Sequence, residues 1–315
     1  MQHNQQYGRR LVVLHGGDSP EREVSLDSGQ NVADSLRAGG YDVCLVDPAE
    51  TSLESVDWHG VLACVMALHG GAGEDGRVQR QLEKLQVPYT GSDSHASWLA
   101  MSKMASKCCF LRDGIPTLSA TKFRTDDSSV AIIRQAALLD FPVVIKPDGG
   151  GSSIGVAVAT RASEVTRLVR ECGAVGSTAL AEPFVRGREL TITLLGRRPL
   201  PVIEIVCPER LFDYASKYQR PTTEYRFRTG LSAKTLRQLD EIAIAATESL
   251  GTRGLVRVDL LLDEEQRPWI LEVNTVPGMT PRSLAPMAAA HAGIDRSALC
   301  HWMVEDCVGQ LARAA

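Results

Sequence analysis

Short apolar segments alternate with amphipathic segments in the first third of the chain. The apolar runs predict strands at 11–14, 41–46, 61–68 and 87–90, and the periodic segments predict helices after residue 19 and at 77–86. Ser19-Pro20-Glu21 suits a helix start, and Gly39-Gly40 suits a helix end. Because strands and helices alternate along this part of the chain, we expect a parallel α/β domain that ends near residue 95.

The pattern changes after residue 95, where the alternation is lost. Apolar periodicity predicts helices at 96–112, 163–172 and about 236–250, and strands at 120–123, 142–146, 155–159, 179–182, 189–195 and 200–206. Residues 207–230 have no usable periodicity and are rich in charge and tyrosine. A loop of that length inside a compact domain is usually functional and often acts as a lid.

Two apolar segments joined by a polar turn predict a β-hairpin near the C-terminal end. They span 255–263 and 268–275, and their interior polar residues are Arg257, Asp259, Glu272 and Asn274. If the turn is centred between residues 265 and 266, Asp259 lies opposite Glu272. Arg257 then lies opposite Asn274, and all four side chains share one face.

Two opposed acids repel each other, so the pairing of Asp259 with Glu272 needs an explanation. A divalent cation supplies one, because Mg²⁺ accepts oxygen atoms from carboxylates and amides. The alternative is that both acids face solvent and Arg257 neutralises them. The apolar character of the strands and the loop that follows them favour the metal site.

The loop after this hairpin offers backbone groups to an anion. Pro277-Gly278 predicts a tight turn with an exposed N–H, which is a candidate oxyanion donor. Ser283 precedes an apolar run and is expected to cap a helix, whose start would also bind a carboxylate.

Two glycine-rich segments are candidate phosphate loops. Lys146 is followed by a glycine-serine loop at 149–155, which differs from a Walker loop because no Gly-Lys-Ser/Thr ends it and no helix follows it directly. This loop can wrap phosphates or form a simple hairpin turn. The literal G-x-G-x-x-G at 71–76 contains two acids that would repel a pyrophosphate, so a dinucleotide site there is disfavoured. His69 ends a buried strand beside it, and a structural histidine is the simpler interpretation.

Charge and composition limit the classes of function. The 34 Lys and Arg residues against 38 Asp and Glu residues give a net charge of −4, so no global basic field attracts nucleic acid or anionic lipid. The apolar run at 61–68 is far shorter than the roughly 20 residues that cross a bilayer. The polar start and eight cysteines without zinc or C-x-x-C spacing indicate a cytoplasmic protein with reduced thiols. The 315 residues suggest about two domains.

Together these motifs resemble the D-alanine–D-alanine ligases of the ATP-grasp superfamily. The similar segments follow one another along nearly the whole chain at 16–29, 68–76, 88–92, 146–155, 188–191, 213–218 and 272–280. The resemblance implies an α/β and α+β protein with the ATP-grasp fold: a Rossmann-like parallel α/β domain at 1–95, and two α+β domains at 96–181 and 182–315 that clamp ATP.

The resemblance also implies roles for individual residues. The implied ATP contacts are Lys103, Lys146, Ser152, Ser153, Glu182, Glu189 and Lys217, and the implied ligands of two Mg²⁺ (or Mn²⁺) ions are Asp259, Glu272 and Asn274. The implied contacts of the first D-alanine are Glu21, which would orient Ser152 and Tyr218, and His69; those of the second are Ser283 and the Leu284 N–H. Arg257 and the Gly278 N–H are implied to stabilise the tetrahedral oxyanion.

The reaction that the resemblance implies has two steps and supplies D-alanyl-D-alanine for peptidoglycan precursors. The carboxylate of one D-alanine attacks the γ-phosphate of ATP, and the amine of a second D-alanine attacks the resulting acyl phosphate, so that ADP and phosphate are released. The resemblance further implies a homodimer.

Three positions bear on how closely the chain follows the family. Ser102 stands where relatives commonly have aspartate, and Arg226 and Arg228 make the predicted lid more basic than usual. The two arginines motivate an alternative, a ligase of the same fold that joins another amino-acid or hydroxy-acid pair. Tyr218 favours D-alanine as the second substrate. A dinucleotide-dependent oxidoreductase and a non-catalytic ATP-binding module are further alternatives, supported by less of the sequence.

Overall fold

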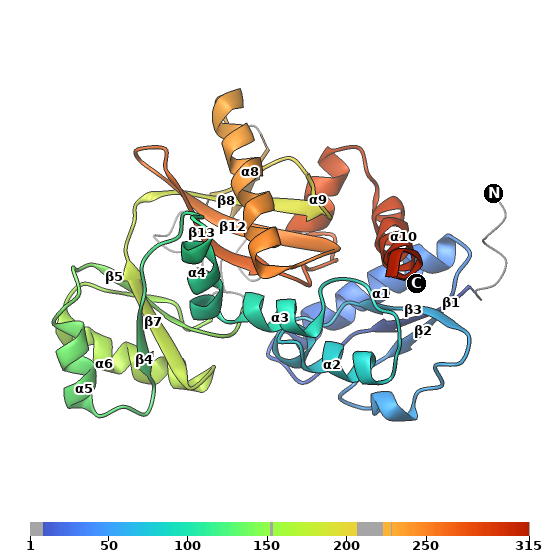
Figure 1. Cartoon of the computed structure of the whole chain (residues 1–315), viewed down its shortest axis with the longest axis horizontal. Coiled ribbons are helices and arrows are strands. Elements are labelled where there is room, and N and C mark those ends of the chain that lie inside the picture. The colour runs from blue at the N-terminus through green and yellow to red at the C-terminus, as the bar shows by residue number, and fades with distance from the viewer. Residues whose placement is uncertain (1–8, 152–153, 207–222, 228, 315) are drawn as a thin grey trace.

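The computed structural model describes residues 9–151, 154–206, 223–227 and 229–314. Its three β-sheets lie in three lobes, with the N-terminal lobe in blue, the central lobe in green and the largest sheet in yellow to orange (Figure 1). Five residues named above lie outside the described residues: Ser152, Ser153, Lys217, Tyr218 and Arg228. Most of the predicted lid at 207–230 is also outside them.

The N-terminal lobe is the predicted parallel α/β unit. Its sheet has the order β2-β1-β3, and its elements are β1 (Arg10–Leu14), α1 (Arg22–Ala38), β2 (Asp42–Val46), η1 (Leu53–Ser55), β3 (Val61–Met66), η2 (Gly71–Gly73) and α2 (Arg77–Lys84). The strand expected at 87–90 is reduced to one bridge between Cys64 and Tyr89. Helix α1 starts after Glu21 and ends at Gly39, as the start and end signals predict.

The central lobe is an antiparallel sheet with helices on one face (Figure 1). Its order is β4-β7-β5-β6, and its elements are β4 (Thr121–Arg124), α5 (Ser129–Ala136), β5 (Val143–Pro147), β6 (Ala157–Ala159), α6 (Ala162–Glu171), η3 (Cys172–Ala174) and β7 (Thr178–Pro183). In β5, Val143 and Ile145 pack into the core with the helices, whereas Val144 and Lys146 face a cavity on the other side. Strand alternation therefore directs Lys146 out of the core.

The third lobe holds a six-stranded antiparallel sheet. The order is β11-β10-β8-β12-β13 with β9 beside β8, and the strands are β8 (Gly187–Leu195), β9 (Arg198–Pro199), β10 (Ile203–Val206), β11 (Glu224–Arg226), β12 (Leu255–Asp263) and β13 (Pro268–Asn274). The segment 207–230 was expected to form a loop, but it contains strand β11, which pairs with the preceding strand β10. Helix α8 (Ala233–Leu250) packs on this sheet and ends at Gly251, whose φ of 70° is the left-handed cap predicted by the glycine.

The single helix expected at 96–112 is instead two helices, α3 (Ser94–Met101) and α4 (Lys103–Arg112). The chain is extended at Ser102, whose hydroxyl accepts a hydrogen bond from Ala105 N and so caps α4. The Asp148 carboxylate, which lies far along the sequence, accepts a second bond from Met104 N at 2.8 Å. A capping group that lies far along the sequence cannot be read from local periodicity, which is why the break was missed.

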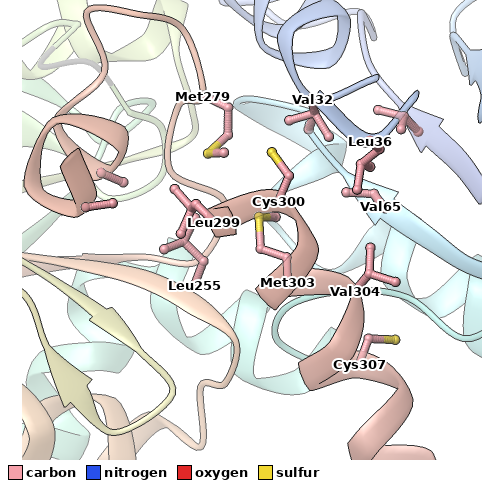
Figure 2. Packing of buried hydrophobic residues seen from close by; sticks show 14 of the residues in the cluster. Val32, Leu36, Val65, Leu255, Met279, Leu299, Cys300, Met303, Val304 and Cys307 are labelled. Atoms are coloured by element: carbon pink, nitrogen blue, oxygen red, sulfur yellow. The ribbon is translucent and has the colours of Figure 1, made fainter. Parts of the chain in front are cut away.

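The last two helices, α9 (Leu284–His291) and α10 (Arg296–Ala314), connect the third lobe to the first. Figure 2 shows Leu299, Cys300 and Val304 of α10 in one apolar cluster with Val32 and Val65. Helix α10 therefore covers the N-terminal sheet, although it follows the third lobe in sequence. None of the helices in the described ranges is long and apolar enough to cross a membrane.

Candidate active site between the three lobes

Two adjoining cavities lie where the lobes meet. The first, of about 450 Å³, is lined by residues of all three lobes, and the second, of about 600 Å³, lies between the central sheet and the largest sheet. The lining of both includes Lys103, Gly150, Gly151, Ile205, Asp259 and Glu272. The two acids of the predicted hairpin therefore stand at the junction of the cavities.

The hairpin has the predicted register at its acidic end. Asp259 is paired with Glu272, and Arg257 is paired with Asn274. A bulge after Asp259 shifts the pairs nearer the turn by one residue, which leaves the polar pairs unchanged. Alternation along β12 buries Val258 and Leu260 in the core and leaves Asp259 facing the cavities.

Cationic side chains surround these opposed carboxylates. Asp259 is buried and accepts bonds from Arg257 Nε at 2.9 Å and from Thr191 Oγ1 at 2.6 Å. Glu272 forms an ion pair with Lys103 Nζ at 3.2 Å. Asp259 is therefore buried rather than solvent-facing, but Arg257 does pair with it as the alternative interpretation expects, so the metal site stays a prediction.

The hairpin offers oxygen donors rather than a cluster of acids and histidines. In the ranges that the structure describes, no group of three or more His, Cys, Asp or Glu side chains is arranged to hold a metal ion. Asn274 lines the first cavity beside the two carboxylates, and its Oδ1 also accepts a bond from Val276 N at 2.9 Å. Two carboxylates and one amide are a donor set that suits a hard cation such as Mg²⁺.

The second cavity contains the side chains that the resemblance relates to ATP. Lys103, Lys146, Glu182 and Glu189 all line it. Lys103 Nζ also donates to the carbonyl of Gly150 at 2.8 Å, at the start of the glycine-serine loop. Glu182 is almost fully buried and pairs with Lys146 at 2.9 Å, so its contact with adenine or ribose stays a prediction.

The first cavity contains the residues related to the amino-acid substrates. Glu21 lines it at the start of α1, beside two glycines that leave room for its carboxylate. A Cβ atom at Gly70 would lie 2.7 Å from Glu21 Oε2, and one at Gly151 would lie 3.2 Å away. The N-terminal lobe and the glycine-serine loop therefore approach each other at this carboxylate.

His69 lines the first cavity, but its ring is engaged within the protein. Nδ1 lies 3.0 Å from the carbonyl of Val276, and Nε2 lies 2.8 Å from Ser28 Oγ. Because a carbonyl only accepts, Nδ1 donates to Val276, and the ring is held at its other nitrogen by the hydrogen bond with Ser28 Oγ. Ser28 Oγ in turn accepts from Met279 N at 3.1 Å. His69 thus connects α1 to the loop that carries Gly278.

That loop places Gly278 and Ser283 side by side at the cavity wall. Ser283 occupies the N-cap position of α9, but its hydroxyl makes no capping bond there. It accepts from Thr280 N at 3.1 Å instead. The expected capping role of the Ser283 side chain is therefore wrong, and the first N–H groups of α9, beginning with Leu284, receive no side-chain cap.

The G-x-G-x-x-G segment is occupied by its own acids. Glu74 is buried and accepts a bond from Gly70 N at 3.0 Å, while Asp75 accepts from Arg77 N. A carboxylate thus occupies the place that a pyrophosphate would take, as the sequence argument expects.

Arg226 is placed away from the substrate cavity. Its guanidinium forms an ion pair with Glu224 on the exposed edge strand β11, and it does not line either cavity. The neighbouring Tyr225 lines the first cavity instead.

Lys107 is a residue that the sequence reasoning missed. It is buried one helical turn after Lys103, and it forms an ion pair with Glu182 at 2.9 Å. The i, i+4 spacing of the two lysines on one helix face is the signal that could have indicated it.

Comparison with known proteins identifies the family of the chain. A family model described as "D-ala D-ala ligase C-terminus" matches residues 110–305. The chain belongs to the D-alanine–D-alanine ligase family. A D-alanine–D-alanine ligase of Bordetella avium is 40% identical over 306 residues, covering 96% of this chain and 95% of that protein.

Solved structures of ligases of this family have the same fold. The crystal structure of the ligase from Bacillus anthracis has a TM-score of 0.84 at 29% identity, covering 97% of this chain and 99% of that one. The same enzyme complexed with ATP has a TM-score of 0.82 at 28% identity, covering 98% of this chain and 99% of that one. The expected ATP-grasp fold with a parallel α/β lobe is confirmed.

Proposed function

We propose that this chain joins two molecules of D-alanine at the expense of ATP, forming D-alanyl-D-alanine for peptidoglycan precursors. One observation supports the roles that we propose for individual residues. Side chains related to the amino acids line one cavity, those related to ATP line the other, and Asp259 and Glu272 stand where the cavities meet. A phosphoryl group has to pass between the two substrates at such a junction.

In the first step, a carboxylate oxygen of the first D-alanine bonds to the γ-phosphorus, and the bond between that phosphorus and ADP breaks. Glu21 lines the first cavity and is proposed to pair with the ammonium of this D-alanine, which would leave the substrate carboxylate directed toward the junction. Lys103 and Lys146 line the ATP cavity and offset the negative charge of the phosphates. Ser152, Ser153 and Lys217 are proposed to close on the phosphates, and Glu189 to contact the nucleoside.

In the second step, the amine of the second D-alanine attacks the acyl carbon, loses a proton, and displaces phosphate. The uncapped start of α9, with Ser283 and the Leu284 N–H, is proposed to bind its carboxylate. Arg257 and the Gly278 N–H line the same cavity and would stabilise the oxyanion. Tyr218 is proposed to act with Glu21 and Ser152. Holding the reactants in place can supply about 7–11 kcal/mol of the barrier.

Asp259, Glu272 and Asn274 are the residues that would hold two Mg²⁺ or Mn²⁺ ions. Two carboxylates and one amide are oxygen donors of the kind that suits this metal. The Asp259 carboxylate pairs with Arg257, and the Glu272 carboxylate pairs with Lys103. When bound, the ions would neutralise charge on the transferring phosphoryl group.

The direct test measures ADP release from purified protein with ATP, Mg²⁺ and D-alanine, together with detection of the dipeptide. ADP release that depends on D-alanine and yields one dipeptide per ADP is expected. A rate that D-alanine does not change would refute the assignment.

The identity of the second substrate is the finer part of the proposal. A panel of D- and L-amino acids and D-lactate as acceptors would distinguish D-alanine from another partner. The exposed pairing of Arg226 with Glu224 supports D-alanine, because it removes one of the two arginines that motivated the alternative. A clear preference for another acceptor would favour the alternative ligase.

Assembly, location and domain limits are further proposals. We propose a homodimer, testable by sedimentation, in the cytoplasm, testable by cell fractionation. The three sheets support three domains, proposed at 1–95, 96–181 and 182–315, although β7 (Thr178–Pro183) carries the central sheet two residues past the second limit and α10 returns to the first domain. Limited proteolysis would test these boundaries.

A further inference from the structure

Three charged side chains form a buried cluster at the wall of the ATP cavity. They are Lys107 of α4, Glu182 of β7 and Lys146 of β5, with 2%, 2% and 7% of each residue exposed. Glu182 lies between the lysines, 2.9 Å from each Nζ atom. Glu182 and Lys146 line the cavity, whereas Lys107 lies behind them and does not.

Oxygen atoms on three sides surround the Lys107 ammonium. Besides Glu182, its Nζ atom donates to Thr117 Oγ1 and to the carbonyl of Leu118, each at 3.0 Å. Two of the three ammonium protons are used in these hydrogen bonds, and Glu182 Oε1 adds an ion-pair contact at 2.9 Å. These oxygen atoms suit a charged lysine. An apolar side chain at position 107 would leave several of them without a hydrogen-bond donor.

The cluster connects the two sheets that form the ATP cavity. Thr117 Oγ1 donates to the carbonyl of Ile270 in β13 at 2.9 Å, which ties Lys107 to the largest sheet. Glu182 and Lys146 belong to the central sheet. A chain of polar contacts therefore runs from Ile270 in β13 through Thr117, Lys107 and Glu182 to Lys146, which lines the cavity.

Charge balance gives the cluster a consequence for anion binding. Two lysines and one glutamate carry a net charge of +1, whereas Lys146 and Glu182 alone would carry none. Burial lowers the pKa of Lys107, but Glu182 opposes that effect by stabilising the ammonium. In a partly buried site, such a charge acts more strongly than it would in water.

We propose that Lys107 is a positioning residue for ATP binding. Lys107 and Lys146 both pair with the Glu182 carboxylate, and this sharing leaves the Lys146 ammonium and a net positive charge available to the phosphates. The inference rests on the proposed function, because it takes this cavity to be the ATP site. Glu182 would then act on ATP binding through its ion pairs with Lys107 and Lys146.

The first test replaces Lys107 with methionine and measures ATP binding by calorimetry. Lys107→Met is expected to raise the Kd for ATP by about tenfold or more, which corresponds to 1.4 kcal/mol. The KM for D-alanine should change by less than about twofold, because Lys107 does not line the amino-acid cavity. Lys122→Met makes the same change at an exposed position on β4 and should leave the Kd unchanged.

The decisive comparison adds Glu182→Gln to Lys107→Met. The double variant restores the net +1 charge at Lys146, so its Kd is expected to fall below that of Lys107→Met and to lie within about tenfold of the wild-type value, which allows for the loss of the Glu182 carboxylate from the cavity wall. Replacing a buried pair as a whole is also better tolerated than removing one partner, so this variant stays informative if the single variant fails to fold.

Two outcomes would overturn the inference. They are an unchanged Kd in Lys107→Met, and a double variant that binds ATP more than tenfold more weakly than wild type. If the wild-type protein itself does not bind ATP, the proposed function fails instead.

Discussion

The contact between Gly278 and Ser283 allows a prediction for the second D-alanine. A Cβ atom at position 278 would lie 2.6 Å from Ser283 Oγ and 3.3 Å from Ser283 Cβ. Carbon atoms in favourable contact lie about 3.5–4.0 Å apart, so Gly278→Ala must push the hydroxyl away. Gly278 does not have a left-handed backbone conformation, so the methyl group adds no backbone strain.

The expected effect is the loss of one hydrogen bond to the carboxylate of the second D-alanine. A bond to a charged group contributes about 1.5–3 kcal/mol, which corresponds to roughly 10- to 150-fold in the KM for this substrate. The KM for ATP should be unchanged, because Gly278 and Ser283 line only the amino-acid cavity. Initial rates of ADP release at saturating ATP, analysed for two D-alanine sites, would measure both.

Ser283→Ala provides the matched control, because it removes the displaced hydroxyl. If displacement is the cause, the double variant Gly278→Ala/Ser283→Ala should resemble Ser283→Ala within about twofold. Fully multiplicative effects in the double variant would refute this reasoning, and so would an equal rise in the KM for ATP. Thermal unfolding of each variant would identify a general loss of stability.

Three further predictions follow from other contacts. Asp259→Asn removes a charged donor at the junction of the cavities and should lower kcat by about 100-fold or more at fixed Mg²⁺; full activity would refute the metal assignment. Arg226→Gln should leave the choice of acceptor unchanged, because Arg226 pairs with Glu224 outside the cavities; a shifted acceptor panel would contradict this. Burial raises the pKa of Asp263, but hydrogen bonds, the first from Trp269, outweigh it and lower the pKa to about 2. Its contribution to stability is therefore present above pH 4 and lost as the pH falls toward 2, and Asp263→Asn should remove that part of the acid dependence in chemical denaturation.

The hairpin that carries Asp259 and Glu272 shows how far local patterns reach. Strand alternation and the length of the turn are local properties, and they were sufficient to pair the two acids and to turn them to one face. The same alternation directs Lys146 toward a cavity. The bulge after Asp259 was not predicted, because nothing in the apolar pattern marks it.

Other features depended on groups that are distant in sequence. The break at Ser102 is stabilised by Asp148, which is distant in sequence, and the orientation of the Ser283 hydroxyl depends on the turn at Thr280 rather than on its helix. The role expected for Glu182 came from its position along the chain, whereas its contacts come from Lys107 and Lys146.

The sequence by itself determined the family, the order of most elements and the register of the acidic hairpin, since each depends on motifs or on neighbouring residues. The tertiary structure alone decided that the residues proposed for the amino acids and those proposed for ATP line two cavities that share Asp259 and Glu272. It also decided that α10 packs on the first lobe (Figure 1) and that Lys107 pairs with Glu182. Burial and ion pairing depend on what surrounds a side chain in space, and the groups that surround Lys107 belong to segments outside its own helix.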